Sequence, residues 1–159
     1  MSGRLEGKKI VVTAAGQGIG KATAIAFHNE GAHVIATDLN EKTLTDLNKE
    51  YPNIKIKTLD STDNKAILDF VKTLDEVNVL FNAVGFVHHG TILDCEEKDW
   101  DFSFDVNIKS MYFMCRAILP LMVKQNGGSI INVSSIASSL KGLPNRFLFT
   151  ALQKLQLLG

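Results

Sequence analysis

The chain has 159 residues, 45% of them hydrophobic, and 17 basic side chains balance 17 acidic ones. This length suits one domain with a sizeable core, and the lack of a basic excess predicts neither nucleic acid nor an anionic membrane as a partner. Uninterrupted apolar runs stay below the roughly 18 residues of a membrane span, and the first residues are polar. We therefore expect a cytoplasmic chain without a membrane segment or signal peptide.

The first predicted strand covers residues 8–14, and a helix over 19–30 follows it and ends at Gly31. The turn between them carries glycines at 16, 18 and 20. The first turn of a helix has backbone N–H groups without intrahelical partners, and the helix dipole adds partial positive charge, so a phosphate is stabilised there. The turn therefore predicts a phosphate-binding site. The expected contacts are Gln17, Gly18, Ile19 and Gly20.

A second predicted strand over 34–37 ends at Asp38, twenty positions after Gly18. In a dinucleotide-binding fold, such a carboxylate accepts hydrogen bonds from the adenosine ribose and repels a 2′-phosphate. This arrangement favours NAD as the cofactor. The alternative is an ordinary strand-to-helix turn with an Asp that caps the helix.

The remaining elements alternate in the same way. Asn40 is predicted to cap a helix that runs to about Glu50, and Asp60 follows a third strand over 54–59. A helix over 63–74, a strand over 77–81, a long helix over 98–124 and a strand over 129–133 follow. The alternation predicts an α/β fold, a doubly wound parallel Rossmann-type sheet of about five strands in the order 3-2-1-4-5. The long helix carries an apolar stripe that we expect to be core or a subunit contact, made by Phe104, Ile108, Met111, Tyr112, Cys115 and Leu119.

Cysteine and histidine spacing does not predict a metal site. Cys95 and Cys115 have no nearby Cys or His at a ligand spacing, so we expect free thiols. His88 and His89 lack a third ligand, and a polar loop is the preferred interpretation.

The segment Thr13-x-x-x-Gln17-Gly18-Ile19-Gly20 resembles the T-G-x-x-x-G-x-G loop of the short-chain dehydrogenase/reductase family, with Ala14 in place of the first Gly. Residues 85–90 and 93–102 resemble the 3-hydroxybutyrate dehydrogenase branch of that family. The resemblance covers residues 1–146, and residues 147–159 form a divergent tail. It implies an NAD-dependent oxidoreductase of a small hydroxy or oxo acid, through 3-hydroxybutyrate oxidation to acetoacetate or 4-oxo-proline reduction. It also implies a homo-oligomer, which is doubtful for this chain.

The resemblance assigns roles to further residues. Asp60 would contact adenine, or alternatively cap the next helix, and Asn82 and Gly85 match the ends of the N-N-A-G segment under the cofactor. Asn107 would organise a proton-relay water. Ser135, or alternatively Ser134, would bind the substrate oxygen. Arg146 would hold the substrate carboxylate, or it is a solvated loop residue.

The catalytic Tyr and Lys of the family are missing, because Phe149 and Gln153 occupy their positions. Phe has no ionisable oxygen, and Gln supplies no cation to acidify a phenol. Back-translating residues 150–159 and reading the neighbouring frame restores a Tyr-x-x-x-Lys sequence, so we interpret 147–159 as a frame-shifted tail. The chain is then expected to be inactive. The alternative function is a non-catalytic fragment that binds NAD weakly or associates with an intact subunit.

Overall fold

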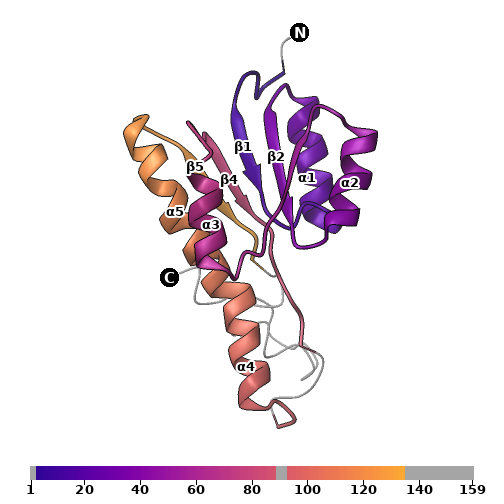
Figure 1. The fold of residues 1–159 in the computed structure, drawn as a ribbon, viewed down its shortest axis with the longest axis vertical. Helices are drawn as coiled ribbons and strands as arrows, with labels where there is room; N and C mark the ends of the chain where they lie inside the picture. The colour runs from indigo at the N-terminus through magenta and orange to yellow at the C-terminus, as the bar shows by residue number, and fades with distance from the viewer. Residues whose placement is uncertain (1–2, 89–92, 135–159) are drawn as a thin grey trace.

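The computed structural model describes residues 3–88 and 93–134 (Figure 1). Five strands form one sheet in the order β3-β2-β1-β4-β5, and every pair is parallel. The predicted fold class and strand order are therefore confirmed. The strands are β1 Lys9–Val12, β2 His33–Asp38, β3 Lys55–Thr58, β4 Val79–Asn82 and β5 Ser129–Asn132.

Helices cover both faces of the sheet, as parallel strands require. One face carries α1 (Gly18–Asn29) and α2 (Glu41–Glu50), and the other carries α3 (Asn64–Val71) and α5 (Ser110–Lys124) (Figure 1). Because the strands are parallel, the carboxyl ends of β1, β2 and β4 lie at the same edge of the sheet. Ligands bind at this edge in folds of this kind.

Successive side chains of β1 alternate between two apolar clusters, because side chains of a strand point to opposite faces. Ile10 and Val12 join the cluster beneath α1 and α2, together with Leu44 and Leu47. Val11 joins the cluster on the other face. The partners of Val11 there include the buried side chains Leu80, Met114, Ile118 and Met122. The central strand is thus anchored on both sides.

Two predicted helix starts depend on capping side chains. Asn40 Oδ1 accepts hydrogen bonds from the N–H groups of Lys42 and Thr43, which confirms the predicted cap of α2. The cap of α3 is Asp63, whose carboxylate accepts from the N–H groups of Lys65 and Ala66. The alternative interpretation of Asp60 as the cap of this helix is therefore wrong.

The predicted long helix runs without a break over Glu97–Lys124, but it is not a regular α-helix. It consists of α4 (Glu97–Phe104), a π-helical segment η1 (Asp105–Lys109) and α5. A π segment holds an additional residue in its turn, which rotates the helix faces on its two sides. Of the predicted stripe, Met111 is buried in the core, whereas Tyr112 and Leu119 are exposed, so the alternative of a subunit contact stays a prediction for these two residues. The buried side chains of this helix are Ser103, Asn107, Ser110, Met111, Met114, Ala117, Ile118 and Met122.

By length and composition, the helix Glu97–Lys124 would be able to cross a membrane. Inspection of uninterrupted apolar runs did not identify it, because Lys109 and Arg116 interrupt the sequence. Met114, Ile118 and Met122 of this helix pack against the sheet in the apolar cluster around Val11. These three side chains thus belong to the core of the domain, whereas Tyr112, Leu119 and Val123 of the same helix are exposed.

Candidate functional site

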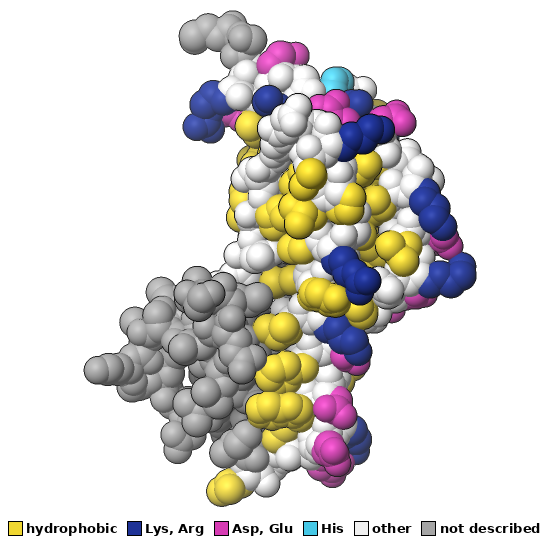
Figure 2. Space-filling view, turned by 90° about the vertical axis from the view of Figure 1, so that its left-hand side faces the viewer, with side chains coloured by type: hydrophobic (Ala, Val, Ile, Leu, Met, Phe, Trp, Pro, Cys, Tyr) yellow, Lys and Arg dark blue, Asp and Glu magenta, His cyan; other side chains and the backbone are white. Residues whose placement is uncertain are grey.

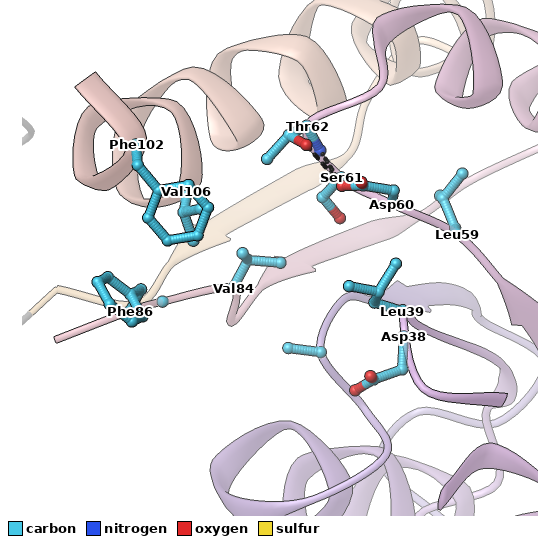
Figure 3. Close-up of a pocket in the computed structure, with 12 residues that line it drawn as sticks. Asp38, Leu39, Leu59, Asp60, Ser61, Thr62, Val84, Phe86, Phe102 and Val106 are labelled. Carbon is cyan, nitrogen blue, oxygen red and sulfur yellow. Dashed lines mark hydrogen bonds between the residues drawn. The ribbon is translucent and has the colours of Figure 1, made fainter. Parts of the chain in front are cut away.

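A cavity of about 280 Å³ opens at the carboxyl edge of the sheet (Figure 3). It lies between the ends of β1, β2 and β4 on one side and the segment from α4 into η1 on the other. This is where a doubly wound sheet binds its ligand. The lining residues are Ala14, Asp38, Leu39, Leu59, Asp60, Ser61, Thr62, Val84, Gly85, Phe86, Phe102 and Val106.

The glycine turn between β1 and α1 is held by backbone hydrogen bonds to both neighbouring strands. Thr13 N–H donates to the Phe81 carbonyl at 3.0 Å, and Ala15 N–H donates to the Thr37 carbonyl at 2.9 Å. The buried Thr13 hydroxyl accepts from Ala83 N–H at 3.0 Å. These bonds fix the position at which α1 begins relative to the ends of β2 and β4.

The N-terminus of α1 is open to a ligand. Gln17 is the N-cap residue, but its side chain makes no capping hydrogen bond, and Gln17, Gly18 and Ile19 are exposed. Gly18 has a φ of 55°, which favours glycine. Gly20 packs so closely on the turn that a Cβ there would overlap the Ala14 carbonyl. The predicted phosphate-binding residues therefore lie together beside the cavity, although they do not line it.

Asp38 is the last residue of β2, and its carboxylate is fixed at the cavity. One carboxylate oxygen, Oδ2, accepts from Gly16 N–H at 2.9 Å, and Oδ1 accepts from Asn40 N–H at 2.9 Å. The glycine turn and the start of α2 thus both hold the Asp38 side chain. An ionised carboxylate has further lone pairs for hydroxyl donors, so this arrangement can accept hydrogen bonds from a ribose.

Asp60 also lines the cavity and organises the loop after β3. Asp60 Oδ1 accepts from Thr62 N–H at 2.8 Å and from the Thr62 hydroxyl at 2.7 Å (Figure 3). This pattern is a local Asx turn. The carboxylate lies across the cavity from Leu39 and Asp38, and its role in binding adenine remains a prediction.

The opposite wall of the cavity is apolar and aromatic. The rings of Phe86 and Phe102 meet edge to face, with centroids 5.0 Å apart and planes at 79° (Figure 3). Asn107, in the π segment, is fully buried and holds the backbone of Phe86. Its Oδ1 accepts from Phe86 N–H at 2.8 Å, and its Nδ2 donates to the Phe86 carbonyl at 2.9 Å. The amide of Asn107 thus positions this wall, and the proton-relay role remains a prediction.

Asn82 ends β4 but does not line the cavity. Its Nδ2 donates to Asn132 Oδ1 at 2.9 Å and to Cys115 Sγ at 3.5 Å. Burial raises the pKa of the Cys115 thiol. Cys95 and Cys115 form no disulfide, which confirms the predicted free thiols. Asn82 therefore joins β4 to β5 and α5, whereas Gly85 lies at the cavity.

Several predicted residues fall outside the part of the chain that the structure describes. They are Ser135, Arg146, Phe149 and Gln153, together with His89. Ser134 lies just after β5. Among residues 3–88 and 93–134, no group of three or more His, Cys, Asp or Glu side chains could hold a metal ion.

The model of the short chain dehydrogenase family matches residues 8–151. The chain belongs to this family. It is 58% identical over 149 residues to dehydrogenase/reductase SDR family member 6 of Rattus norvegicus, covering 94% of this chain and 60% of the rat protein. The chain thus spans about 60% of the length of the rat protein.

Two other comparisons agree with the family. The chain is 49% identical over 146 residues to 2-keto-3-deoxy-L-fuconate dehydrogenase of Xanthomonas campestris, covering 92% of this chain and 49% of that protein. A crystal structure of a putative short-chain dehydrogenase/reductase from Burkholderia xenovorans superposes with a TM-score of 0.87 at 29% identity, covering 97% of this chain and 66% of that one. The fold is therefore that of the short-chain dehydrogenases.

The sequence analysis missed most of the apolar lining of the cavity. Leu39 directly follows β2, and Ser61 and Val84 lie in the loops just after β3 and β4, so strand positions indicate this region. Phe102 and Val106 gave no such signal, because their direction depends on the helix phase around the π segment.

Proposed function

We propose that this chain binds NAD through the adenosine half of the cofactor. The observation that carries the proposal is the Asp38 carboxylate, which Gly16 N–H and Asn40 N–H hold beside the open N-terminus of α1. A carboxylate suits the ribose hydroxyls of NAD and repels the additional phosphate of NADP. The adjacent helix N-terminus suits a pyrophosphate. The donors and acceptors present therefore fit NAD, which when bound would supply the hydride acceptor.

The inherited chemistry is oxidoreduction of a small hydroxy or oxo acid in the cytoplasm, of the 3-hydroxybutyrate to acetoacetate or 4-oxo-proline type. The names of the relatives support a dehydrogenase. We propose that this chain does not itself complete the reaction, because Phe149 and Gln153 replace the proton-transferring pair. Ser135 and Arg146 would still supply contacts to the oxygen and carboxylate of the substrate.

Calorimetric titration with NAD and NADP tests the nucleotide proposal. We expect the parent chain to bind NAD more tightly than NADP. Asp38→Asn should weaken NAD binding by about tenfold, which corresponds to about 1.4 kcal/mol for hydrogen bonds to a charged acceptor. The same variant should reduce the preference for NAD over NADP, because Asn lacks the negative charge that repels the 2′-phosphate of NADP. Equal affinities of the parent chain for the two nucleotides would contradict the proposal.

Asp63→Asn is a matched control, because Asp63 also holds two N–H groups at a helix start but does not line the cavity. It should leave the nucleotide affinity unchanged. Formation of NADH from NAD and 3-hydroxybutyrate is measured in parallel. Turnover above a blank without protein would refute the proposed inactivity but leave the binding site standing.

A second candidate function is association with another subunit. Tyr112, Leu119 and Val123 of α5 are 53%, 49% and 68% exposed, and hydrophobic side chains gather along this side of the molecule (Figure 2). Exposed apolar side chains that gather on one side of a protein are typical of protein contacts. Sedimentation of the parent chain and of Leu119→Lys tests it, since a charge in a contact between copies should shift the distribution towards monomer.

A further inference from the structure

Ala14 adopts a backbone conformation that is unfavourable for its side chain. Its φ is 49°, in the left-handed region where a Cβ crowds the following carbonyl oxygen. Among the described residues, Asn126 is the other non-glycine residue with a positive φ, and asparagine tolerates this region better. Alanine gains no local hydrogen bond in return.

The surroundings of Ala14 impose this conformation. Both sequence neighbours are held by strands on opposite sides, Thr13 by Phe81 and Ala15 by Thr37. Gly20 packs directly on the Ala14 carbonyl. The backbone therefore cannot rotate to a negative φ without breaking these contacts. Strain of this kind persists where the structure over-determines it, and it concentrates at functional sites.

The methyl group of Ala14 lies at the cavity. Ala14 is half-buried and lines it together with Asp38 and Leu39. Asp38 is held against this same turn through Gly16 N–H at 2.9 Å. Ala14 thus lies on the same side of the cavity as the Asp38 carboxylate, which would accept the ribose hydroxyls.

We propose that Ala14 is a specificity-determining residue of the nucleotide site: its methyl group narrows the cavity beside Asp38 and admits a ribose without a 2′-phosphate. The proposal rests on the proposed NAD binding. It adds a steric barrier to the electrostatic repulsion by Asp38. A glycine at this position would relieve the backbone and widen the cavity by one methyl group.

The test compares Asp38→Asn with the double variant Ala14→Gly/Asp38→Asn, because removal of the charge makes NADP binding measurable. Calorimetric titration gives the affinities for NAD and NADP. We expect Ala14→Gly to raise the affinity for NADP relative to NAD by about fourfold, the change that corresponds to one methyl group. The melting temperature should rise by about 1–4 °C, because the left-handed strain is relieved.

Asn126→Gly in the same Asp38→Asn background is the matched control, since it relieves a positive φ at the turn after α5, away from the cavity. Its NADP to NAD ratio should not change. An unchanged ratio for Ala14→Gly in a chain that binds NAD would overturn this proposal alone, and so would a lower melting temperature. Absence of NAD binding by the parent chain would overturn the proposed function as well.

Discussion

The two walls of the cavity are built on different principles. The polar wall consists of Ala14 and Asp38, backed by the glycine turn (residues 13–20), and hydrogen bonds join this turn to the two neighbouring strands and to the Asp38 carboxylate. In the apolar wall, formed by residues 84–86 and 102–107, the buried amide of Asn107 holds the Phe86 backbone, and the rings of Phe86 and Phe102 are in contact. The polar wall has several independent supports, whereas the apolar wall depends on Asn107.

This difference separates the tasks of the two walls. A phosphate and a ribose need donors and acceptors at fixed positions, and such positions come from a strand end or a helix start. A base needs apolar faces, which several side chains can supply. On the proposed function, the polar wall would set which nucleotide binds, and the apolar wall would contribute contact area. Variants that act on one wall at a time test this distinction.

The largest effect is expected for Gly20→Ala in the polar wall. A Cβ at this position would overlap the Ala14 carbonyl, a backbone atom that cannot move aside. We expect the free energy of unfolding to fall by about 3 kcal/mol or more, at the upper end for overpacking, together with loss of NAD binding. Urea denaturation followed by circular dichroism measures the change.

Gly18→Ala is the matched comparison in the same turn. Gly18, unlike Gly20, has a positive φ, but nothing lies within 4 Å of a Cβ placed there. Its cost should be that of the backbone conformation alone, about 1 kcal/mol. Equal losses for the two variants would show that steric overlap with Ala14 is not what Gly20 avoids.

The next effect is expected for Asn107→Ala in the apolar wall. The change leaves the N–H and C=O groups of Phe86 without their partner, and each unpaired group costs about 1–3 kcal/mol when buried. Because Phe86 is partly exposed and water can reach it, we expect a total loss of about 2 kcal/mol in the free energy of unfolding. Denaturant unfolding measures it.

Ser103→Ala is the control for Asn107→Ala. Ser103 is also a buried polar residue of the same helix, but its hydroxyl donates within the helix to the Asp99 carbonyl at 2.6 Å. Its removal should cost about 1 kcal/mol or less, since no group of the cavity wall loses a partner. A larger loss for Ser103→Ala than for Asn107→Ala would contradict the assigned role of Asn107.

The two walls also differ in how far the sequence predicts them. Local sequence patterns predict the glycine turn, the position of Asp38 and the Asn40 cap. The strand order follows because the rules for connections between parallel strands leave few arrangements. The π segment was not predicted, because residues 98–124 were interpreted as one continuous α-helix. The apolar stripe was predicted as core or a subunit contact, and its residue Met111 is buried whereas Tyr112 and Leu119 are exposed. The contacts of the Asn82 side chain were also not predicted, since its partners Cys115 and Asn132 lie far away in the sequence.

The smallest effect is expected at Asp69 of α3, which belongs to neither wall. Side-chain hydrogen bonds from Lys72 and Lys65, at 2.8 and 2.9 Å, lower the pKa of this exposed carboxyl group to about 2. A carboxyl group whose pKa is lower in the folded state stabilises the fold above its unfolded pKa of about 4. This contribution is lost as the pH falls towards about 2.

Asp69→Asn should therefore lower the melting temperature slightly near neutral pH, and the difference from the parent chain should vanish as the pH falls towards about 2. Thermal melts of both chains across this range measure it. A difference that stays constant with pH would show that the two lysine contacts do not stabilise the ionised form. NAD affinity at neutral pH should remain unchanged, because Asp69 lies away from the cavity, so this variant gives the baseline against which changes in either wall are judged.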